Sequence, residues 1–139
     1  MDKKKDKILF WVETVDLTFG IAKSLIEKYD CDPYALMAYS PKQKSFFDNQ
    51  KLVKFTKSWN LRDYVNQKNH KSDIEKLKTL EEKFSLSLKK IIYGDRFFYK
   101  YNHYRQFTDE EIFGIIEQEL NFYVQILDEI NPDYVIKIG

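Results

Sequence analysis

The feature that most constrains the fold is a run of five consecutive apolar residues, Ile8 to Val12, within the segment KILFWVE. A strand with one face in water alternates apolar and polar side chains, whereas a parallel strand covered on both faces is continuously apolar. We therefore expect a buried parallel strand over Lys7 to Glu13. Such a strand needs covering layers on both faces of its sheet, which indicates the α/β class.

A helical pattern follows this strand. Asp16 is of a residue type that caps helix N-termini, and apolar side chains then recur every three or four positions from Leu17 to Tyr29. The helix should end in the segment DCDP, because Pro33 disfavours helical geometry in the residue before it. The chain therefore begins with a strand and a crossover helix.

Two further strands and a second helix are expected before residue 60. An apolar run from Tyr34 to Ser40 predicts the second strand, and Ser40-Pro41 is typical of a helix start, here of a short helix across residues 42–50. The segment KLVKF, Lys51 to Phe55, predicts a third short strand. With right-handed crossovers, this order is half of a doubly wound sheet.

The next part of the chain has the pattern of an amphipathic helix. We expect the chain to be helical from Asn60 to Ile92: apolar residues recur at helical spacing from Ile74 to Ile91, and Glu and Lys fill the other face as solvated surface. The segment FSLS, residues 84–87, predicts a break into two helices, because serine side chains compete for backbone hydrogen bonds.

A long helix and a fourth strand close the sequence. Thr108 and Glu111 fit a capping box, in which each side chain satisfies the other residue's free amide. The helix can run to Asn131, Pro132 ends it, and the segment DYVIKI, residues 133–138, predicts the fourth strand.

These elements predict an α/β, Rossmann-like three-layer sandwich with a four-stranded, mostly parallel sheet in the order 3-2-1-4 and extra helices. Residues 1–6 would form a basic tail and residues 7–139 one domain. Ligands of doubly wound sheets bind at the carboxyl ends of the strands where the winding reverses, here between the first and fourth strands. The fourth strand would be a bare edge, so we expect a missing C-terminal domain or a partner to cover it. On this interpretation the chain is the N-terminal half of a longer two-domain protein.

Charge and cysteine content exclude some classes of partner. Lys and Arg total 23 against 22 Asp and Glu, a net charge of +1, so we expect no nucleic-acid partner. The lysines of the first seven residues form either a solvated tail or a membrane-surface contact. Cys31 is the single cysteine, and its neighbours Asp30 and Asp32 should raise its thiol pKa.

The chain has no apolar stretch long enough for a membrane span and no signal-peptide pattern. We therefore expect a cytoplasmic location, peripheral to the inner face of the membrane if the basic tail contacts lipid. No glycine-rich nucleotide loop follows the first strand, and two histidines with one cysteine make a zinc site improbable. We expect neither a cofactor nor a metal in this chain.

Glu13 is the best-placed candidate for catalysis, since it ends the first strand on the ligand side of the sheet. Its carboxylate could act as a general base on a hydroxyl or hold a sugar by hydrogen bonds. The alternative is a helix-capping or loop carboxylate that faces water.

The segment YGDRFFYKYNHYRQF, residues 93–107, is the second candidate region. Asp95 could orient Arg96, whose guanidinium could clamp a phosphate or carboxylate, or the pair could tie a loop to a helix end. His103 could act as an acid or base, or as a hydrogen-bonded packing residue. The rings could stack on sugars or form a small aromatic core. The residues that we assign to substrate binding here are Asp95, Arg96, Tyr99, Tyr101 and Arg105.

Three segments resemble the N-terminal region of capsular and surface polysaccharide biosynthesis proteins, which are similar to two-domain GT-B glycosyltransferases. They are KILFWVETVDLTFGIAKSLIEK, LEEKFSLSLKKIIYGDRFFYKYNHY and LDEINPDYVI. The likeness covers nearly the whole chain from about Lys7.

This resemblance implies a Rossmann-like half that binds a glycan or lipid-linked sugar acceptor and supplies the base. Glu13, Asp95, Arg96 and His103 would then line the acceptor cleft. The nucleotide-sugar donor would bind the missing C-terminal domain, so this chain alone would be inactive. A different hypothesis is a non-catalytic α/β binding module that recognises a partner protein or small ligand through its aromatic segment.

Overall fold

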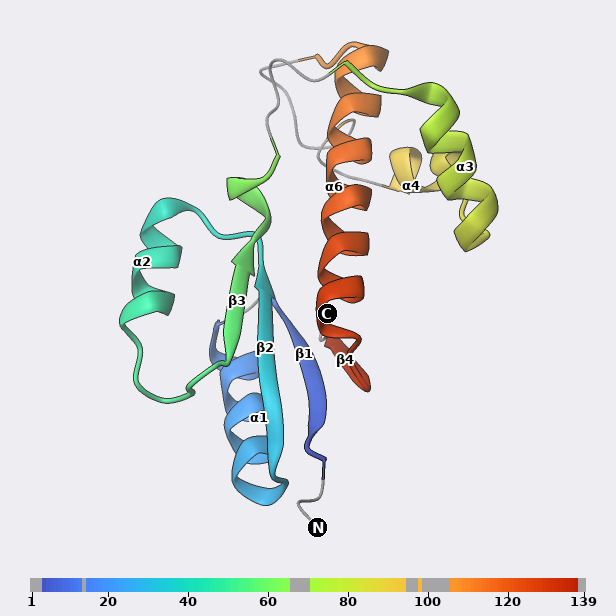
Figure 1. The fold of residues 1–139 in the computed structure, drawn as a ribbon. Helices are drawn as coiled ribbons and strands as arrows, with labels where there is room; N and C mark the ends of the chain where they lie inside the picture. The colour runs from blue at the N-terminus through green and yellow to red at the C-terminus, as the bar shows by residue number, and fades with distance from the viewer. Residues whose placement is uncertain (1–3, 14, 66–70, 95–97, 99–105, 138–139) are drawn as a thin grey trace. The chain divides into compact units, whose positions relative to one another are not determined.

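The computed structural model describes residues 4–13, 15–65, 71–94, 98 and 106–137. They form two compact units (Figure 1). The sheet unit comprises Met1–Tyr64 and Tyr123–Gly139, and the helical unit comprises Val65–Phe122. One long helix, α6 (Asp109–Ile130), contributes its first part to the helical unit and its last part to the sheet unit.

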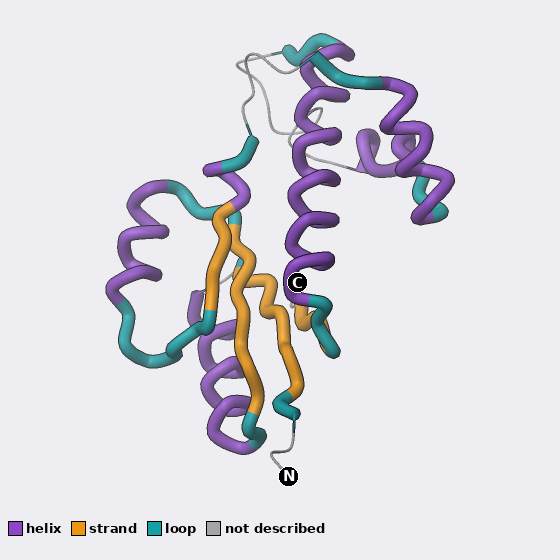
Figure 2. The backbone as a smooth tube through the Cα atoms, in the orientation of Figure 1, coloured by secondary structure: helices purple, strands orange, loops and turns teal. Residues whose placement is uncertain are grey.

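The sheet unit contains four strands that are all parallel. They are β1 (Asp6–Val12), β2 (Cys31–Met37), β3 (Lys57–Asn60) and β4 (Tyr134–Lys137), in the order β3-β2-β1-β4 (Figure 2). The predicted α/β class, the Rossmann-like arrangement and the strand order are therefore confirmed.

Helices cover both faces of this sheet. On one face, Phe10 of β1 packs in one buried cluster with Phe19 of α1 (Val15–Lys28) and Phe47 of α2 (Pro41–Asn49). On the other face, the rings of Trp11 and Tyr123 lie 5.2 Å apart between β1 and the last part of α6. Adjacent residues of β1 thus point into different apolar layers, which explains why this strand is continuously apolar.

The third strand lies later in the chain than the sequence pattern predicts. Residues 51–55 form a loop, in which the side chain of Gln50 accepts hydrogen bonds from the backbone N–H groups of Leu52 (2.8 Å) and Val53 (3.0 Å). Val53 is nevertheless buried in the core. The apolar pattern of this segment therefore came from burial of a loop, and β3 begins only at Lys57, before a single turn of 3-10 helix (Leu61–Asp63).

The second strand begins at Cys31 and so includes Pro33, which we had placed before it. The carbonyl of Pro33 accepts a hydrogen bond from the backbone N–H of Thr56, 2.7 Å away. In a strand, the N–H and C=O of one residue point to the same side, so a backbone N–H at position 33 would also point toward Thr56 and not toward β1. Since β3 begins only at Lys57, the missing N–H of Pro33 costs the sheet no hydrogen bond between strands.

The turn that leads into β4 is fixed by Lys7. Its ammonium donates to the carbonyl of Ile130 (2.8 Å), at the C-terminus of α6, where a positive charge is favourable. Its backbone N–H donates to the carboxylate of Asp133 (2.8 Å), whose own N–H donates back to the carbonyl of Lys7 (2.9 Å). These contacts hold the start of β4 beside β1.

The helical unit contains α3 (Ile74–Phe84), α4 (Leu88–Gly94) and the first part of α6. The predicted break between α3 and α4 is confirmed, since Ser85 ends α3 in the left-handed conformation with a φ of 51°. The predicted capping box is also confirmed: Thr108 N–H donates to Glu111 (3.0 Å), and Glu111 N–H donates to the Thr108 hydroxyl (3.2 Å).

Two rings of the aromatic segment pack inside the helical unit. Phe98 is buried, and its ring meets that of Phe107 edge to face with 5.5 Å between centroids. Both contact a core that includes Leu77 and Ile116. For these two rings, packing into a small aromatic core is confirmed.

Replacing Phe10 should test the central position of β1. Phe10 is fully buried, so Phe10→Ala should lower the free energy of unfolding by about 3–5 kcal/mol. Phe46→Ala is the matched control, because Phe46 is 58% exposed on α2 and should change stability by less than about 1 kcal/mol. Both tryptophans, Trp11 and Trp59, belong to the sheet unit, so urea titration followed by tryptophan fluorescence reports its unfolding. An equal decrease in the free energy of unfolding in the two variants would contradict the central position of β1.

Candidate functional site

Glu13 is the one predicted site residue that the structure describes. It is exposed and follows the last residue of β1, as expected from the sequence. The other predicted site residues lie outside the described residues: Asp95, Arg96, Tyr99, Tyr101, His103 and Arg105. Their roles remain predictions.

The winding of the sheet reverses between β1 and β4. From β1 the chain proceeds through β2 to β3 in one direction, whereas β4 lies on the opposite side of β1. Helices α1 and α2 cover one face and the last part of α6 covers the other, so the connection that leaves β1 and the connection that enters β4 lie on different faces of the sheet. The carboxyl ends of these two strands therefore form the switch point at which doubly wound sheets bind ligands.

Glu13 faces a lysine at this switch point. The Nζ atom of Lys137, the last residue of β4, lies 3.4 Å from Oε1 of Glu13. Both side chains are about half exposed, and an ion pair in such a position stabilises a protein by at most about 1 kcal/mol. The pair orients the carboxylate without closing it off from solvent.

Two aromatic rings lie beside this ion pair. Lys137 is also the register partner of Trp11, and its Nζ atom lies 4.9 Å from the centroid of the Trp11 ring. The Trp11 ring in turn contacts Tyr123 at an interplanar angle of 37°. We call Trp11, Glu13, Tyr123 and Lys137 the switch-point cluster.

Sequence reasoning found only one member of this cluster. The sequence pattern places Trp11 and Lys137 only in strands, and Tyr123 only in the long helix that follows Thr108. The sequence did contain a signal for Lys137, because polar residues at the carboxyl ends of two strands that are predicted to be neighbours should lie close together. The register that pairs Trp11 with Lys137 could not be read from the local pattern.

The switch-point cluster suits a ligand that has both hydroxyl groups and apolar surface. The Glu13 carboxylate accepts hydrogen bonds, and the Lys137 ammonium donates them. The half-buried rings of Trp11 and Tyr123 add apolar surface beside them. A sugar ring presents hydroxyls at its edge and C–H groups on its faces, so it can use all of these groups at once.

The carboxyl ends of β2 and β3 carry polar groups with structural partners. The side-chain oxygen of Asn60, which is buried, accepts from the N–H of Tyr39 (2.9 Å), and its amide donates to the carbonyl of Tyr39 (3.1 Å). Arg62 Nε donates to the carbonyl of Ala38 at 3.2 Å. These hydrogen bonds hold the loop after β2 in place.

Two buried hydroxyls follow the ends of β1 and β2. Thr18 Oγ1 and the Tyr39 hydroxyl have no hydrogen-bond partner within the described part of the chain. Burial raises the pKa of the Tyr39 phenol, so this group is neutral at physiological pH. Neither hydroxyl reaches solvent, and we do not include them in the candidate site.

Cys31 lies at the opposite, amino-terminal edge of the sheet, at the start of β2. Burial raises its thiol pKa, and the charges of Asp32 and Asp30 raise it further. The predicted direction of this shift is confirmed. A protonated, buried thiol is a poor nucleophile, so Cys31 is not a catalytic candidate.

Within the residues that the structure describes, no three His, Cys, Asp or Glu side chains come close enough together to hold a metal ion. Over the same residues, no helix has the length and apolar character needed to cross a bilayer.

Comparisons of the chain with protein-family models, with curated proteins and with solved structures found no match. The functional argument therefore depends on the geometry of the switch-point cluster and on the resemblance of the three sequence segments.

The raised pKa of Cys31 predicts a specific pH dependence. In the folded chain, the rate of reaction with a disulfide reagent should rise with pH through a midpoint above that of the same thiol in urea. Asp32→Asn removes one cause of the shift and should move the folded midpoint down. Since the folded pKa is the higher one, the contribution of Cys31 to stability is complete below the unfolded pKa and is lost as pH rises through the folded pKa. A folded midpoint at or below the unfolded one would contradict the assignment.

Proposed function

We propose that this chain is the acceptor-side, N-terminal domain of a glycosyltransferase-like protein of surface or capsular polysaccharide biosynthesis. The observation that supports it most is the position of Glu13 at the switch point, beside the rings of Trp11 and Tyr123. A carboxylate next to aromatic rings can bind a sugar and accept a proton from one of its hydroxyls.

In the proposed reaction, Glu13 takes the proton of an acceptor hydroxyl while the hydroxyl oxygen forms a bond to the anomeric carbon of the donor sugar. The bond from that carbon to the nucleoside diphosphate breaks, and the diphosphate leaves with the bonding electrons. Lys137 orients the Glu13 carboxylate, and Trp11 and Tyr123 hold the acceptor ring. General-base catalysis of this kind contributes about 10²–10⁴-fold to the rate.

Donor binding and the further acceptor contacts involve a second domain and residues that the structure does not describe. The nucleotide-sugar donor binds a C-terminal domain, and the acceptor is a glycan or a lipid-linked sugar. Asp95, Arg96, Tyr99, Tyr101, Arg105 and His103 contribute further acceptor contacts. The protein works in the cytoplasm, peripheral to the inner face of the membrane.

The edge of the sheet supports the proposed second domain or partner. Within the described residues β4 pairs with β1 alone, and Tyr134 and Val135 are both more than half exposed although they point to opposite faces. A strand with an open edge and apolar side chains on both faces favours association with more polypeptide.

A non-catalytic binding module is the second candidate function. The observation that favours it is the ion pair of Glu13 with Lys137, because the carboxylate then already has a partner within the sheet. Such a module would use Trp11 and Tyr123 for binding and would need no base.

The experiment compares Glu13→Gln with Glu27→Gln, since Glu27 is another exposed carboxylate paired with a lysine, Lys23 on α1. Glu13→Gln should lower sugar transfer by the full-length protein about 10²–10⁴-fold and change acceptor binding by less than about threefold. Trp11→Ala should weaken acceptor binding about tenfold, because one aromatic stacking contact contributes about 1–3 kcal/mol. Glu27→Gln should change neither quantity.

Transfer activity is measured with radiolabelled donor, and binding is measured by isothermal titration calorimetry with the glycan that binds best on an array. Unchanged transfer in Glu13→Gln together with lost binding in Trp11→Ala would support the non-catalytic module instead. Tight binding of a nucleotide sugar to this chain would contradict the placement of the donor site in another domain.

A further inference from the structure

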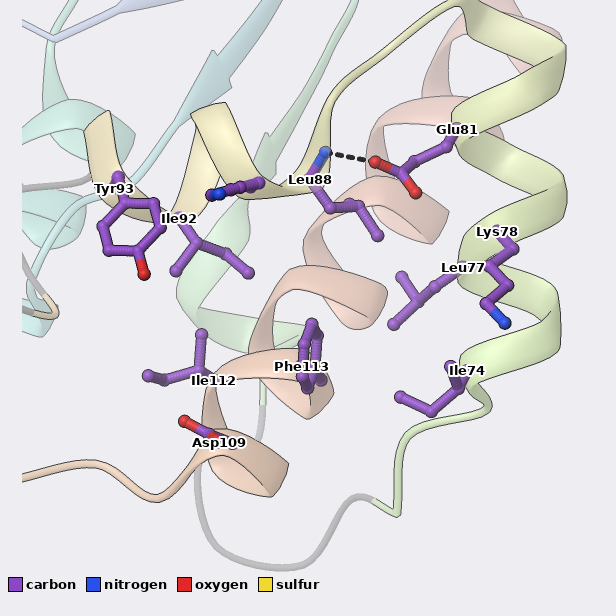
Figure 3. A pocket seen from close by; sticks show the side chains of 11 residues that line it. Ile74, Leu77, Lys78, Glu81, Leu88, Ile92, Tyr93, Asp109, Ile112 and Phe113 are labelled. Atoms are coloured by element: carbon purple, nitrogen blue, oxygen red, sulfur yellow. Dashed lines mark hydrogen bonds between the residues drawn. The ribbon is translucent and has the colours of Figure 1, made fainter.

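Two surfaces of the molecule have no part in sugar transfer: a pocket in the helical unit and the open edge of the sheet at β4. The pocket has a volume of about 430 Å³ and lies between α3, α4 and α6 (Figure 3). Most of its wall is aliphatic or aromatic, and two lysines and two carboxylates in the lining balance in charge: Lys78, Lys89, Glu81 and Asp109. The charge of this lining therefore selects no class of ligand, whereas the edge at β4 is more specific.

The β4 edge can accept a further strand. Within the described residues, β4 pairs with β1 on one side only. The backbone N–H and C=O groups of alternate β4 residues therefore point away from the sheet, where an added strand can bind them. Backbone hydrogen bonds of this kind provide affinity, and the side chains decide which strand fits.

The side chains distinguish this edge from the opposite one. Tyr134 and Val135 are 59% and 53% exposed, and they point to opposite faces because adjacent residues of a strand alternate. At the opposite edge of the sheet, the exposed residues of β3 are Lys57 and Ser58, whereas Trp59 is buried. Charged and polar edges oppose association, and exposed apolar residues favour it. The β4 edge is therefore the one that favours a partner.

A second copy of the same edge can pair with β4 in few registers. In an antiparallel pair, a residue whose N–H and C=O point outward must lie opposite another such residue. These residues alternate along β4, so odd-numbered residues must meet odd-numbered ones. A symmetric pair of two β4 strands is therefore centred on a residue, and not on the bond between two residues.

The register centred on Val135 satisfies the side chains on both faces. On one face, Val135 meets Val135 of the second copy, and Asp133 meets Lys137 of the second copy on either side of it. On the other face, Tyr134 meets Ile136, which is partly buried against the core. Apolar pairs and pairs of opposite charge stabilise a sheet when they lie directly opposite each other. In the register centred on Ile136, Val135 would instead meet a lysine.

The charged residues of this register are accessible. Asp133 and Lys137 are both exposed. Asp133 accepts the N–H of Lys7 through Oδ2, so its second carboxylate oxygen can accept from another donor. The ammonium of Lys137 has three N–H groups and lies 3.4 Å from one oxygen of Glu13. Both groups can therefore keep their present contacts and form a new one.

We propose that two copies of this chain associate edge to edge through β4, in an antiparallel pairing centred on Val135. The two sheets join into one continuous sheet, with a two-fold axis at Val135 and the same surface of each copy in the interface. This inference specifies the partner at the β4 edge. It is independent of sugar transfer, because association is measured without donor or acceptor.

A cysteine at the centre of the register tests the pairing directly. Opposed residues of an antiparallel pair have Cα atoms about 4.5–5.5 Å apart, a distance that a disulfide spans. Val135→Cys should therefore give a disulfide-linked dimer under mild oxidation, which a non-reducing gel detects. Tyr134→Cys is the matched control: Tyr134 is similarly exposed but lies opposite Ile136, so it should cross-link at least about tenfold more slowly. The native Cys31 is buried and does not compete.

Sedimentation velocity measures the association of the unmodified chain. It should show a concentration-dependent equilibrium between a monomer of 16.8 kDa and a dimer of twice that mass. Lys137→Glu places like charges opposite each other at Asp133 and should weaken the dimer about tenfold. Lys57→Glu is the matched control, since each lysine pairs with a glutamate and lies 4.9 Å from the centroid of a tryptophan ring, but Lys57 belongs to the opposite edge. This variant should leave the dimer unchanged.

Circular dichroism confirms that each variant is folded before it is measured. A chain that stays monomeric over the whole concentration range would overturn the proposal and leave the edge to a second domain or a different protein. Equal cross-linking of the two cysteine variants would overturn the register. Equal association of Lys137→Glu and the unmodified chain would overturn the pairing of Asp133 with Lys137.

Discussion

Burial of β1 on both of its faces is the constraint on which the rest of the structure depends. Leu9, Phe10 and Val12 are all nearly or fully buried, and adjacent residues point into different layers. One layer needs α1 and α2, and the other needs the last part of α6. Since β1 also pairs with a parallel strand on each side, it fixes both the layering and the point at which the winding reverses.

That reversal gives the sheet its candidate site. The ends of β1 and β4 bring together residues more than 120 positions apart in the sequence, Glu13 and Lys137, and place them beside Trp11. Each group is ordinary by itself. Together they offer an acceptor, a donor and an apolar surface at the position where parallel α/β sheets bind their ligands, which is why we base the proposed function on them.

Local sequence patterns correctly predicted those features that depend on residues close together in the sequence. The start of α2 at Ser40-Pro41, the capping box of α6 and the break at Ser85 depend on residues within a few positions of one another. The third strand was misplaced because Val53 is apolar for packing in a loop, which a strand pattern cannot distinguish. The Trp11–Lys137 register and the helical pocket depend on long-range packing, and no local pattern contains that information.

The most direct test of the account is a nuclear Overhauser experiment on the isotope-labelled chain, with backbone protons of β1 and β4 assigned. The account predicts amide-to-Hα contacts between the two strands in a parallel register that joins Ile8 to Tyr134 and Trp11 to Lys137. Contacts in an antiparallel pattern, or none between residues 6–12 and 134–137, would contradict it, because Glu13 and Lys137 would then not meet at a switch point.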